Sequence, residues 1–172
     1  MNLELNTNEL KACLLIAAKK DVRYYLNGIL MDIKADNKTT LVATDGHTLL
    51  AIKGESEEFL EATQIILPRE VVEGAIKLSG KNPCVWLIKE ADGYSLGGVK
   101  FTPIDGTFPQ YDRVIPSETL AHDKQVVASY NPVYLMQVSK ALTLVHGEGG
   151  TLLQNGLNAG VQFVNPNKAI AV

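Results

Sequence analysis

Residues 41–52 read LVATDGHTLLAI, and residues 108–116 read FPQYDRVIP. The first stretch is an apolar run that breaks at Asp45-Gly46-His47 and resumes at once, a pattern typical of two strands joined by a tight turn that contains glycine. The second stretch ends an expected strand in a proline-rich loop. Together they predict two strands joined by a tight turn and, about sixty residues later, a strand that ends in a loop.

The composition is that of a globular protein, with 172 residues of which 46% are hydrophobic and 20% are charged. The chain is long enough to bury a core without disulfides, and disorder is expected only at the termini. The formal net charge of −3 excludes a surface that is basic throughout. It allows one basic face that binds nucleic acid, because a phosphate backbone responds to the local field.

The two cysteines, Cys13 and Cys84, each lie in an apolar stretch. They are predicted to be buried reduced thiols and not a disulfide or a metal site. The N-terminal residues MNLELNTNEL lack the charged and apolar regions of a secretory signal, and no apolar run reaches the length of a membrane span. A cytoplasmic location without a membrane partner is therefore expected.

A plan of strand, helix and strand-rich tail occurs three times, with a period of roughly sixty residues. Helices are predicted over residues 8–20, from Pro68 to Gly80, and from Asn131 onward. Asn6 and Asn131 are candidate N-caps, and Gly80 is a candidate C-cap. Three βαβββ units predict an α+β fold with helices on one face of antiparallel sheets.

Two such units can place their helices on one side of a shared sheet and complete a domain, which is expected over residues 1–118. The third unit, residues 119–172, is then a half-unit with an apolar helix stripe and open strand edges. Open strand edges and exposed apolar helix faces tend to pack against another part of the protein or another chain. The third unit is therefore expected to pair with another chain.

Three motifs carry a resemblance to a known family. DVRYYLNG at residues 21–28, ATDGH at 43–47 and FPQYDRVIP at 108–116 occur here in the order and spacing of the bacterial beta sliding clamp, the processivity subunit of the replicative DNA polymerase. Residues 3–116 resemble the middle domain of that clamp across nearly its whole length. A lone ATDGH would be a weak signal, but three motifs in register are strong.

The third unit resembles half of the clamp's last domain. Residues 128–142, ASYNPVYLMQVSKAL, look like its strand-to-helix segment, and residues 167–172, NKAIAV, look like its final strand. The resemblance implies the DNA-clamp architecture in a shortened relative, with the middle domain and half of the last one. The family's first domain is absent, and the chain stops at Val172 before the usual Met-Pro-Met-type tail.

The resemblance implies a cleft that captures short peptides between the middle and last domains. The matching positions are Leu26, Thr44, Gly46, His47, Leu49, Pro109, Arg113 and Val114, with Val172 as part of the terminal strand. Apolar walls with a few polar groups suit a peptide, and a further wall is expected from the third unit. The family's basic residue after the histidine is Thr48 here, and the alternative is that these residues serve strand and turn structure alone.

The resemblance also implies that the helices face duplex DNA. The predicted helices carry six basic residues against three acidic ones, although the whole chain is acidic. The expected phosphate-contacting residues are Lys11, Lys19, Lys20, Arg69, Lys77 and Lys140, together with Arg23, which lies beside two tyrosines just after the first helix. This segregation suits contacts that ignore base sequence, but lysines also flank any amphipathic helix.

Catalysis is not expected. Asp45 and His47 could act as an acid–base pair, but no nucleophile lies at a recognisable spacing from them. His122 and His146 have no neighbouring ligands in the sequence, so neither a metal nor a cofactor is expected.

The sequence therefore predicts a non-catalytic protein of the sliding-clamp type that oligomerises around or on duplex DNA. It would act as a processivity or tethering platform by holding clamp-binding peptides of polymerases or other DNA-processing proteins. Four chains of three units each match the unit number of a clamp ring, so a homotetramer is hypothesised and a dimer is the other possibility. The alternative is a clamp-fold interaction or decoy protein that binds clamp-binding peptides, or the host clamp, without encircling DNA.

Overall fold

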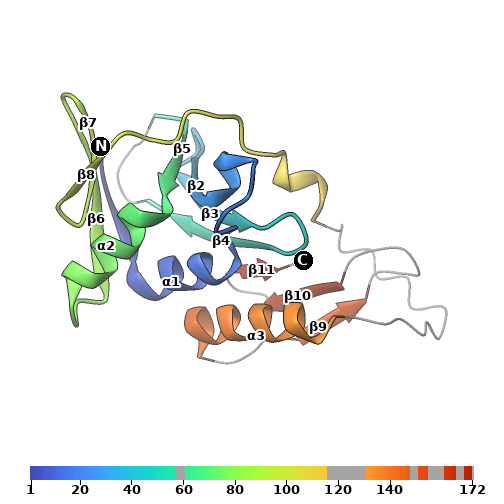
Figure 1. Ribbon diagram of the computed structural model, residues 1–172. Helices are drawn as coiled ribbons and strands as arrows, with labels where there is room; N and C mark the ends of the chain where they lie inside the picture. Colours follow the sequence, from blue (N-terminus) through green and yellow to red (C-terminus); the bar gives the residue numbers. More distant parts are fainter. Residues whose placement is uncertain (57–60, 116–130, 148–150, 155–160, 166–168, 172) are drawn as a thin grey trace.

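The computed structural model describes residues 1–56, 61–115, 131–147, 151–154, 161–165 and 169–171. Its strands form two antiparallel sheets (Figure 1). The first sheet has the order β1-β6-β7-β8 and comprises β1 (Asn2–Asn6), β6 (Cys84–Glu90), β7 (Gly93–Leu96) and β8 (Val99–Phe101). The second has the order β5-β2-β3-β4-β11-β10-β9 and comprises β2 (Gly28–Ile33), β3 (Lys38–Thr44), β4 (Leu49–Glu55), β5 (Thr63–Pro68), β9 (Thr151–Gln154), β10 (Val161–Asn165) and β11 (Ala169–Ala171).

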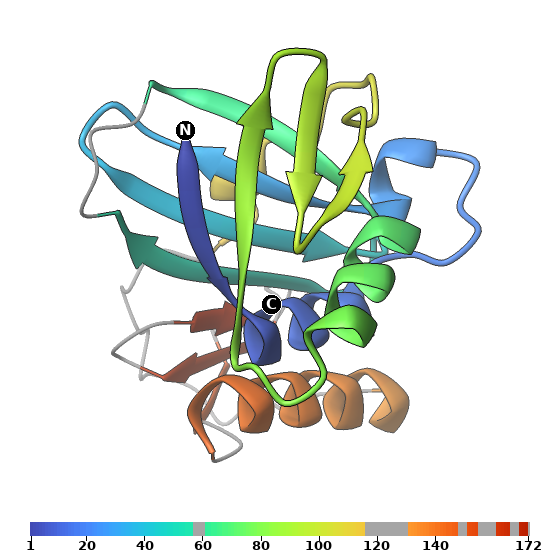
Figure 2. The same cartoon turned by 90° about the vertical axis from the view of Figure 1, so that its left-hand side faces the viewer.

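The helices of the described residues are α1 (Thr7–Ile16), α2 (Arg69–Ser79) and α3 (Pro132–His146). They lie beside one another with α1 in the middle, in contact with both α2 and α3 (Figure 2). Short 3-10 turns occur at Tyr24–Asn27 and Tyr111–Arg113. None of the described helices is long and apolar enough to cross a membrane.

The α+β class and the βαβββ plan are confirmed, with the orders β1-α1-β2-β3-β4 and β5-α2-β6-β7-β8 in the first two units. The expectation of one sheet shared by these units is wrong. The opening strands are exchanged, because β1 pairs with β6 and β5 pairs with β2. Each sheet thus contains strands from both units, and this exchange ties the two units into one body.

The helix starts follow the asparagine signals of the sequence. The Asn8 amide donates to Asn6 Oδ1 at 2.8 Å, and the Val133 amide donates to Asn131 Oδ1 at 3.0 Å, so both predicted N-caps are confirmed. α2 ends at Gly80, where the φ of 59° lies in the region that glycine tolerates best. These local signals placed the starts of α1 and α3 and the end of α2 correctly, whereas Pro68, expected as the first residue of α2, is its N-cap.

The main core lies between the helices, the first sheet and one face of the second sheet. Leu10, Cys13 and Ile16 of α1 are at most 2% exposed and belong to one apolar cluster with strand residues such as Ile29 and Leu50. Cys13 is a free, buried thiol as predicted, whereas the free Cys84 is only half-buried. α1 is therefore the central helix of the core.

The opposite face of the second sheet is buried as well. Residues 104–115, called the covering segment below, follow β8, run across this face and include the second 3-10 turn (Figure 1). Phe108 and Tyr111 are buried there in a second cluster with sheet residues such as Leu30 and Val42. Cover on both faces explains why β2 is buried along its whole length.

The third unit joins the first unit of the same chain. β11 pairs antiparallel with β4, with Ile170 opposite Ala51, and α3 packs beside α1. The apolar face of α3 and one edge of the third unit were expected to pack against another chain, but here they pack against the first unit of the same chain. β9 lies at the end of the second sheet, where it could pair with a strand of another chain. The expected opening strand of this unit and the boundary at residues 118 and 119 lie outside the described residues.

Candidate functional site

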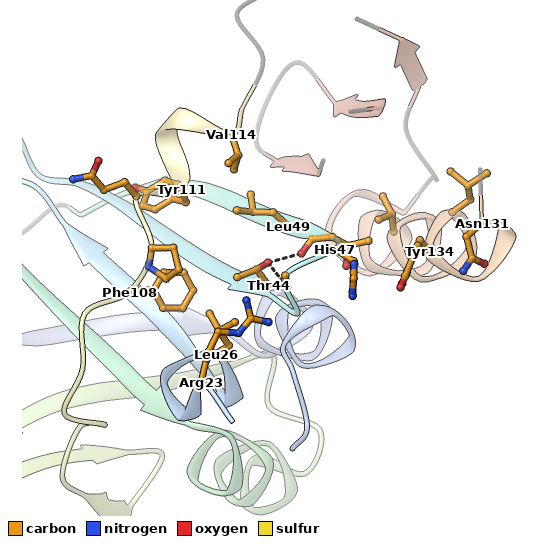
Figure 3. A pocket seen from close by; sticks show the side chains of 16 residues that line it. Arg23, Leu26, Thr44, His47, Leu49, Phe108, Tyr111, Val114, Asn131 and Tyr134 are labelled. Carbon is orange, nitrogen blue, oxygen red and sulfur yellow. Dashed lines mark hydrogen bonds between the residues drawn. The ribbon is translucent and has the colours of Figure 1, made fainter. Parts of the chain in front are cut away.

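The turn between β3 and β4 is held by one carboxylate and two hydroxyls. The amides of His47 and Thr48 donate to Asp45 Oδ1 at 2.8 and 2.7 Å, and the Thr48 hydroxyl donates to the same oxygen at 3.1 Å. The Thr44 hydroxyl donates to the Thr48 carbonyl at 2.7 Å and accepts from the Gly46 amide at 3.0 Å (Figure 3). Asp45 thus organises the turn through the backbone and is not seen to orient the imidazole of His47.

This turn borders a pocket of about 450 Å³ that lies between the first and third units, called the inter-unit pocket below (Figure 3). Seven of the predicted cleft residues line it, namely Leu26, Thr44, Gly46, His47, Leu49, Pro109 and Val114. The other lining residues are Arg23, Thr48, Phe108, Gln110, Tyr111, Asn131, Tyr134, Leu135 and Val138. The expected wall from the third unit is present, because α3 and its N-cap supply four of these residues.

Two predicted cleft residues are not among the described lining. Arg113 lies in the 3-10 turn next to the pocket, but its side chain is exposed and does not line it. Val172 lies outside the described residues. The predicted role of these two residues stays a prediction.

The pocket has an apolar floor and a polar rim. Leu26, Leu49 and Val138 are 1%, 6% and 3% exposed, so their side chains are fixed by packing. Val114 is 56% exposed at the edge. A buried apolar floor with an exposed apolar edge can take up apolar side chains of a ligand.

A stacked ring pair closes the pocket between the two units. The rings of His47 and Tyr134 lie 5.5 Å apart between centroids with an interplanar angle of 19° (Figure 3). His47 belongs to the β3–β4 turn and Tyr134 to α3, so the contact joins the first unit to the third. Docking of the third unit therefore determines the shape of the pocket.

Arg23 was predicted to contact DNA, and the structure places it at the pocket. Its guanidinium makes a two-pronged contact with Asp21, at 2.9 Å from Nε to Oδ1 and 2.7 Å from Nη2 to Oδ2. The hydrogen bonds from Arg23 lower the pKa of Asp21 to about 2. The same guanidinium lies so close to Gly46 that a Cβ at that glycine would be 2.7 Å from Nη2. Arg23 is thus a preordered cation on the pocket rim.

Arg69, also predicted to contact DNA, has a structural role in the fold. Its side chain is 14% exposed and donates to the carbonyl oxygens of Leu14, Ala17 and Ala18 at 3.0, 2.6 and 3.2 Å. Carbonyls at a helix C-terminus lack helical partners, and a cation there is favourable. Arg69 therefore caps the end of α1, and its guanidinium is committed to that contact.

Four of the predicted lysines are exposed on or next to the adjoining helices α1, α2 and α3, called the helix row below. α1 ends at Ile16 and not at the predicted Lys20, so Lys19 and Lys20 follow the helix as exposed side chains. Lys77 on α2 and Lys140 on α3 are exposed too. Lys11 is half-buried and donates to Asn8 Oδ1 at 3.3 Å.

Sequence reasoning missed the pocket roles of Asn131 and Tyr134. It used Asn131 as a helix cap and Tyr134 as part of an apolar stripe, and both descriptions hold locally. The signal that could have found them is their place in the strand-to-helix segment that resembles the clamp's last domain. Among the described residues, no group of three His, Cys, Asp or Glu is arranged to hold a metal ion.

The fold and the position of the pocket define a class, the α+β domains of the sliding-clamp type. A DNA polymerase III beta-subunit-type structure from Eubacterium rectale matches 99% of this chain and 64% of its own length with a TM-score of 0.76, and at 14% identity this likeness concerns the fold alone. The DNA polymerase sliding clamp of Pseudomonas aeruginosa matches 67% of this chain and 35% of its own, with a TM-score of 0.54 and 27% identity.

The sequence places the chain within this class. The family described as DNA polymerase III beta subunit, central domain, matches residues 4–110, and the chain belongs to this family. The beta sliding clamp of Vibrio cholerae is 38% identical over 109 residues, which are 59% of this chain and 29% of that protein. The chain thus spans about 30% of the length of the curated relatives it matches. The predicted family resemblance is confirmed.

Proposed function

We propose that this chain is a non-catalytic, sliding-clamp-type protein that holds clamp-binding peptides in the inter-unit pocket and associates with duplex DNA through its helix row. The observation that carries the proposal is the pocket itself. Four stretches of the chain, residues 23–26, 44–49, 108–114 and 131–138, converge around a volume of about 450 Å³. A volume of this order suits a few side chains of a short peptide and not a folded domain.

The chemistry of the lining supports a peptide as the occupant. The floor is apolar and rigid, whereas the rim carries the Arg23 guanidinium, the His47 ring and the Asn131 amide. Apolar anchors on a peptide can enter the floor while its backbone and polar side chains meet the rim. Peptides of polymerases or other DNA-processing proteins are the partners that the family membership favours.

The helix row supports contact with DNA. Lys19, Lys20, Lys77 and Lys140 are exposed on or next to three adjoining helices, while the chain as a whole carries a charge of −3. Such an arrangement attracts the phosphate backbone through a term that depends on salt and not on base sequence. Arg69 no longer belongs to the proposed contact set.

The assembly we propose is a homo-oligomer around or on duplex DNA in the cytoplasm, with a four-chain ring as the first possibility and a dimer as the second. The proposed domain division is a two-unit domain over residues 1–118 and a third unit over 119–172. Light scattering at micromolar concentration tests the assembly. A stable monomer under those conditions would contradict every ring.

Peptide binding is tested with a fluorescein-labelled clamp-binding peptide by anisotropy. Val114→Glu places a charge at the pocket edge and should weaken binding about tenfold or more, because a charge beside an apolar anchor is poorly solvated. Val22→Glu is the matched control, since Val22 is 95% exposed and does not line the pocket. Equal affinity of the two variants would refute the pocket as the binding site.

DNA association is tested by retention on nicked circular and linear duplex at increasing salt. Reversing Lys19, Lys20 and Lys77 to glutamate should abolish retention, because each lost phosphate contact lowers the salt-dependent affinity. Lys89→Glu on β6 is the control, as Lys89 is exposed on a strand away from the helix row. Unchanged retention in the triple variant would exclude the helix row as the DNA-binding surface.

The alternative function is a clamp-fold interaction or decoy protein that binds peptides, or the host clamp, without encircling DNA. One observation favours it, namely that a single chain supplies the described lining of the pocket. Peptide capture then requires no ring. Full peptide affinity combined with no retention on either form of DNA would support this alternative over the clamp.

A further inference from the structure

The covering segment carries one wall of the inter-unit pocket and lies on the outer face of the second sheet. Phe108 and Tyr111 anchor it by burial, at 4% and 5% exposure, and Pro109 and Val114 project to the pocket from the same stretch. At its start, the Ile104 amide donates to the Ile66 carbonyl at 3.0 Å. The position of this segment therefore decides how far the wall stands from the floor.

A buried polar contact ties the far end of the segment to the sheet. The Tyr111 hydroxyl donates to Asp32 Oδ2 at 2.6 Å, across 79 residues of sequence. Asp32 lies in β2 and is 6% exposed, and its other oxygen accepts from Gln64 Nε2 at 3.2 Å. A carboxylate buried in this way depends on its donors, because its lost hydration must be replaced.

The ion pairs at this end are weak. Lys34 Nζ lies 3.9 Å from Asp32 Oδ2 and 3.7 Å from Asp112 Oδ2, but the side chains of Lys34 and Asp112 are 48% and 67% exposed. Ion pairs at such exposure contribute little. Burial, and then the bond to Asp32, raise the pKa of Tyr111, so its hydroxyl remains a donor through the physiological range. The Tyr111–Asp32 bond is thus a stronger tie than these ion pairs.

We propose that Asp32 and Tyr111 are positioning residues for the inter-unit pocket, acting as a latch that holds the covering segment where its wall faces the peptide. This inference rests on the proposed peptide-binding function. Asp32 does not line the pocket, so it acts only through the segment. Without the hydroxyl, Asp32 Oδ2 needs another donor, and a water that enters between the segment and β2 to supply one moves Pro109 and Val114 away from the floor.

The expected loss of peptide affinity follows from the fraction of molecules in which the pocket wall is in place. When only a fraction of molecules has the wall in place, the apparent dissociation constant rises by the inverse of that fraction. Tyr111→Phe keeps the ring and removes the donor, so we expect labelled clamp-binding peptide to bind roughly three- to tenfold more weakly. Tyr94→Phe is the matched control, at a half-buried tyrosine of the first sheet, and should bind as the unmodified chain does.

Variants at Asp32 separate a latch from a direct contact of Tyr111 with the peptide. Asp32→Leu should weaken binding as much as Tyr111→Phe does, and the double variant should be no weaker than either single one. Asp32→Asn is the conservative variant, because its carbonyl accepts from Tyr111 while Gln64 turns its amide to match. It should restore affinity to within about twofold of the unmodified chain.

Amide hydrogen exchange of residues 108–115 gives a readout without peptide. Exchange should accelerate in Tyr111→Phe and Asp32→Leu and stay slow in Asp32→Asn. Binding by the unmodified chain together with unchanged affinity in Tyr111→Phe would overturn the latch alone. No binding by the unmodified chain would overturn the proposed peptide site and the latch with it.

Discussion

Replacing Arg69 with alanine removes the cap of α1 and tests how the first two units hold together. The lost guanidinium donates to the carbonyl oxygens of Leu14, Ala17 and Ala18 at 3.0, 2.6 and 3.2 Å. Hydrogen bonds from a charged group contribute about 1.5 to 3 kcal/mol each, but water can enter the space left by the side chain and replace part of them. We expect Arg69→Ala to lower the free energy of unfolding by about 2 to 4 kcal/mol.

Urea denaturation followed by far-ultraviolet circular dichroism measures this loss. At an m-value near 2 kcal/mol per molar, the midpoint should fall by roughly 1 to 2 M with little change in slope. Arg69→Lys should lose an intermediate amount, because one ammonium cannot reach all three carbonyls. The exposed ion pair of Arg69 with Glu73 should contribute little, since Glu73 is 56% exposed.

Lys77→Ala is the matched control on the same helix. Lys77 is exposed, so its removal should change the free energy of unfolding by no more than about 0.5 kcal/mol. A change of that small size in Arg69→Ala would refute the capping role. It would also return Arg69 to the residues available for DNA.

Three further predictions concern the pocket and its turn. Asp45→Ala should cost about 1 to 2 kcal/mol and weaken peptide binding, because three donors of the turn lose Oδ1; thermal unfolding and anisotropy measure both effects. Gly46→Ala should cost about 1 to 2 kcal/mol, because φ is +89° and the new Cβ would displace Arg23; chemical denaturation measures it, and an unchanged stability would contradict the reasoning. Asp21 has a pKa of about 2 in the folded protein against an ordinary 3.8. Its contact with Arg23 therefore stabilises the folded protein above pH 3.8, and this stabilisation is lost as the pH falls through 2. A carboxyl NMR titration checks that value, and a midpoint near 3.8 would exclude the Arg23 contact.

Much of the local structure could be predicted because its causes are local. An asparagine before an apolar stretch and a glycine after it are signals within one helix, and Asn6, Asn131 and Gly80 act as they indicate. The floor of the pocket could be predicted as well, since its residues fall within short motifs that resemble one family. Leu26 and Leu49 line the pocket as expected.

Contacts that depend on tertiary packing could not be predicted. The helical spacing allows Glu73 to pair with a basic residue four positions away on either side, and the sequence alone favours Lys77. The structure has the pair with Arg69, because the carbonyls of α1 already hold that guanidinium beside Glu73. The bond between Asp32 and Tyr111 spans 79 residues and has no periodic signature.

The exchange of opening strands between the units has the same origin. The sequence of β1 is compatible with pairing to a strand of its own unit or of the next unit. Its alternating pattern determines which side chains face the core but not which strand lies beside it. In the structure β1 pairs with β6. Tertiary packing, which the sequence pattern does not display, decides between the two.

The central claim is that the inter-unit pocket holds a clamp-binding peptide, and NMR of the ¹⁵N-labelled chain during peptide titration tests it most directly. We predict the largest amide shifts at Gly46, His47, Tyr111 and Tyr134, which come from three of the four stretches that line the pocket. The exposed strand residues Trp86 and Ile88 should not shift. Shifts confined to other surfaces, or no shifts at millimolar peptide, would contradict the claim.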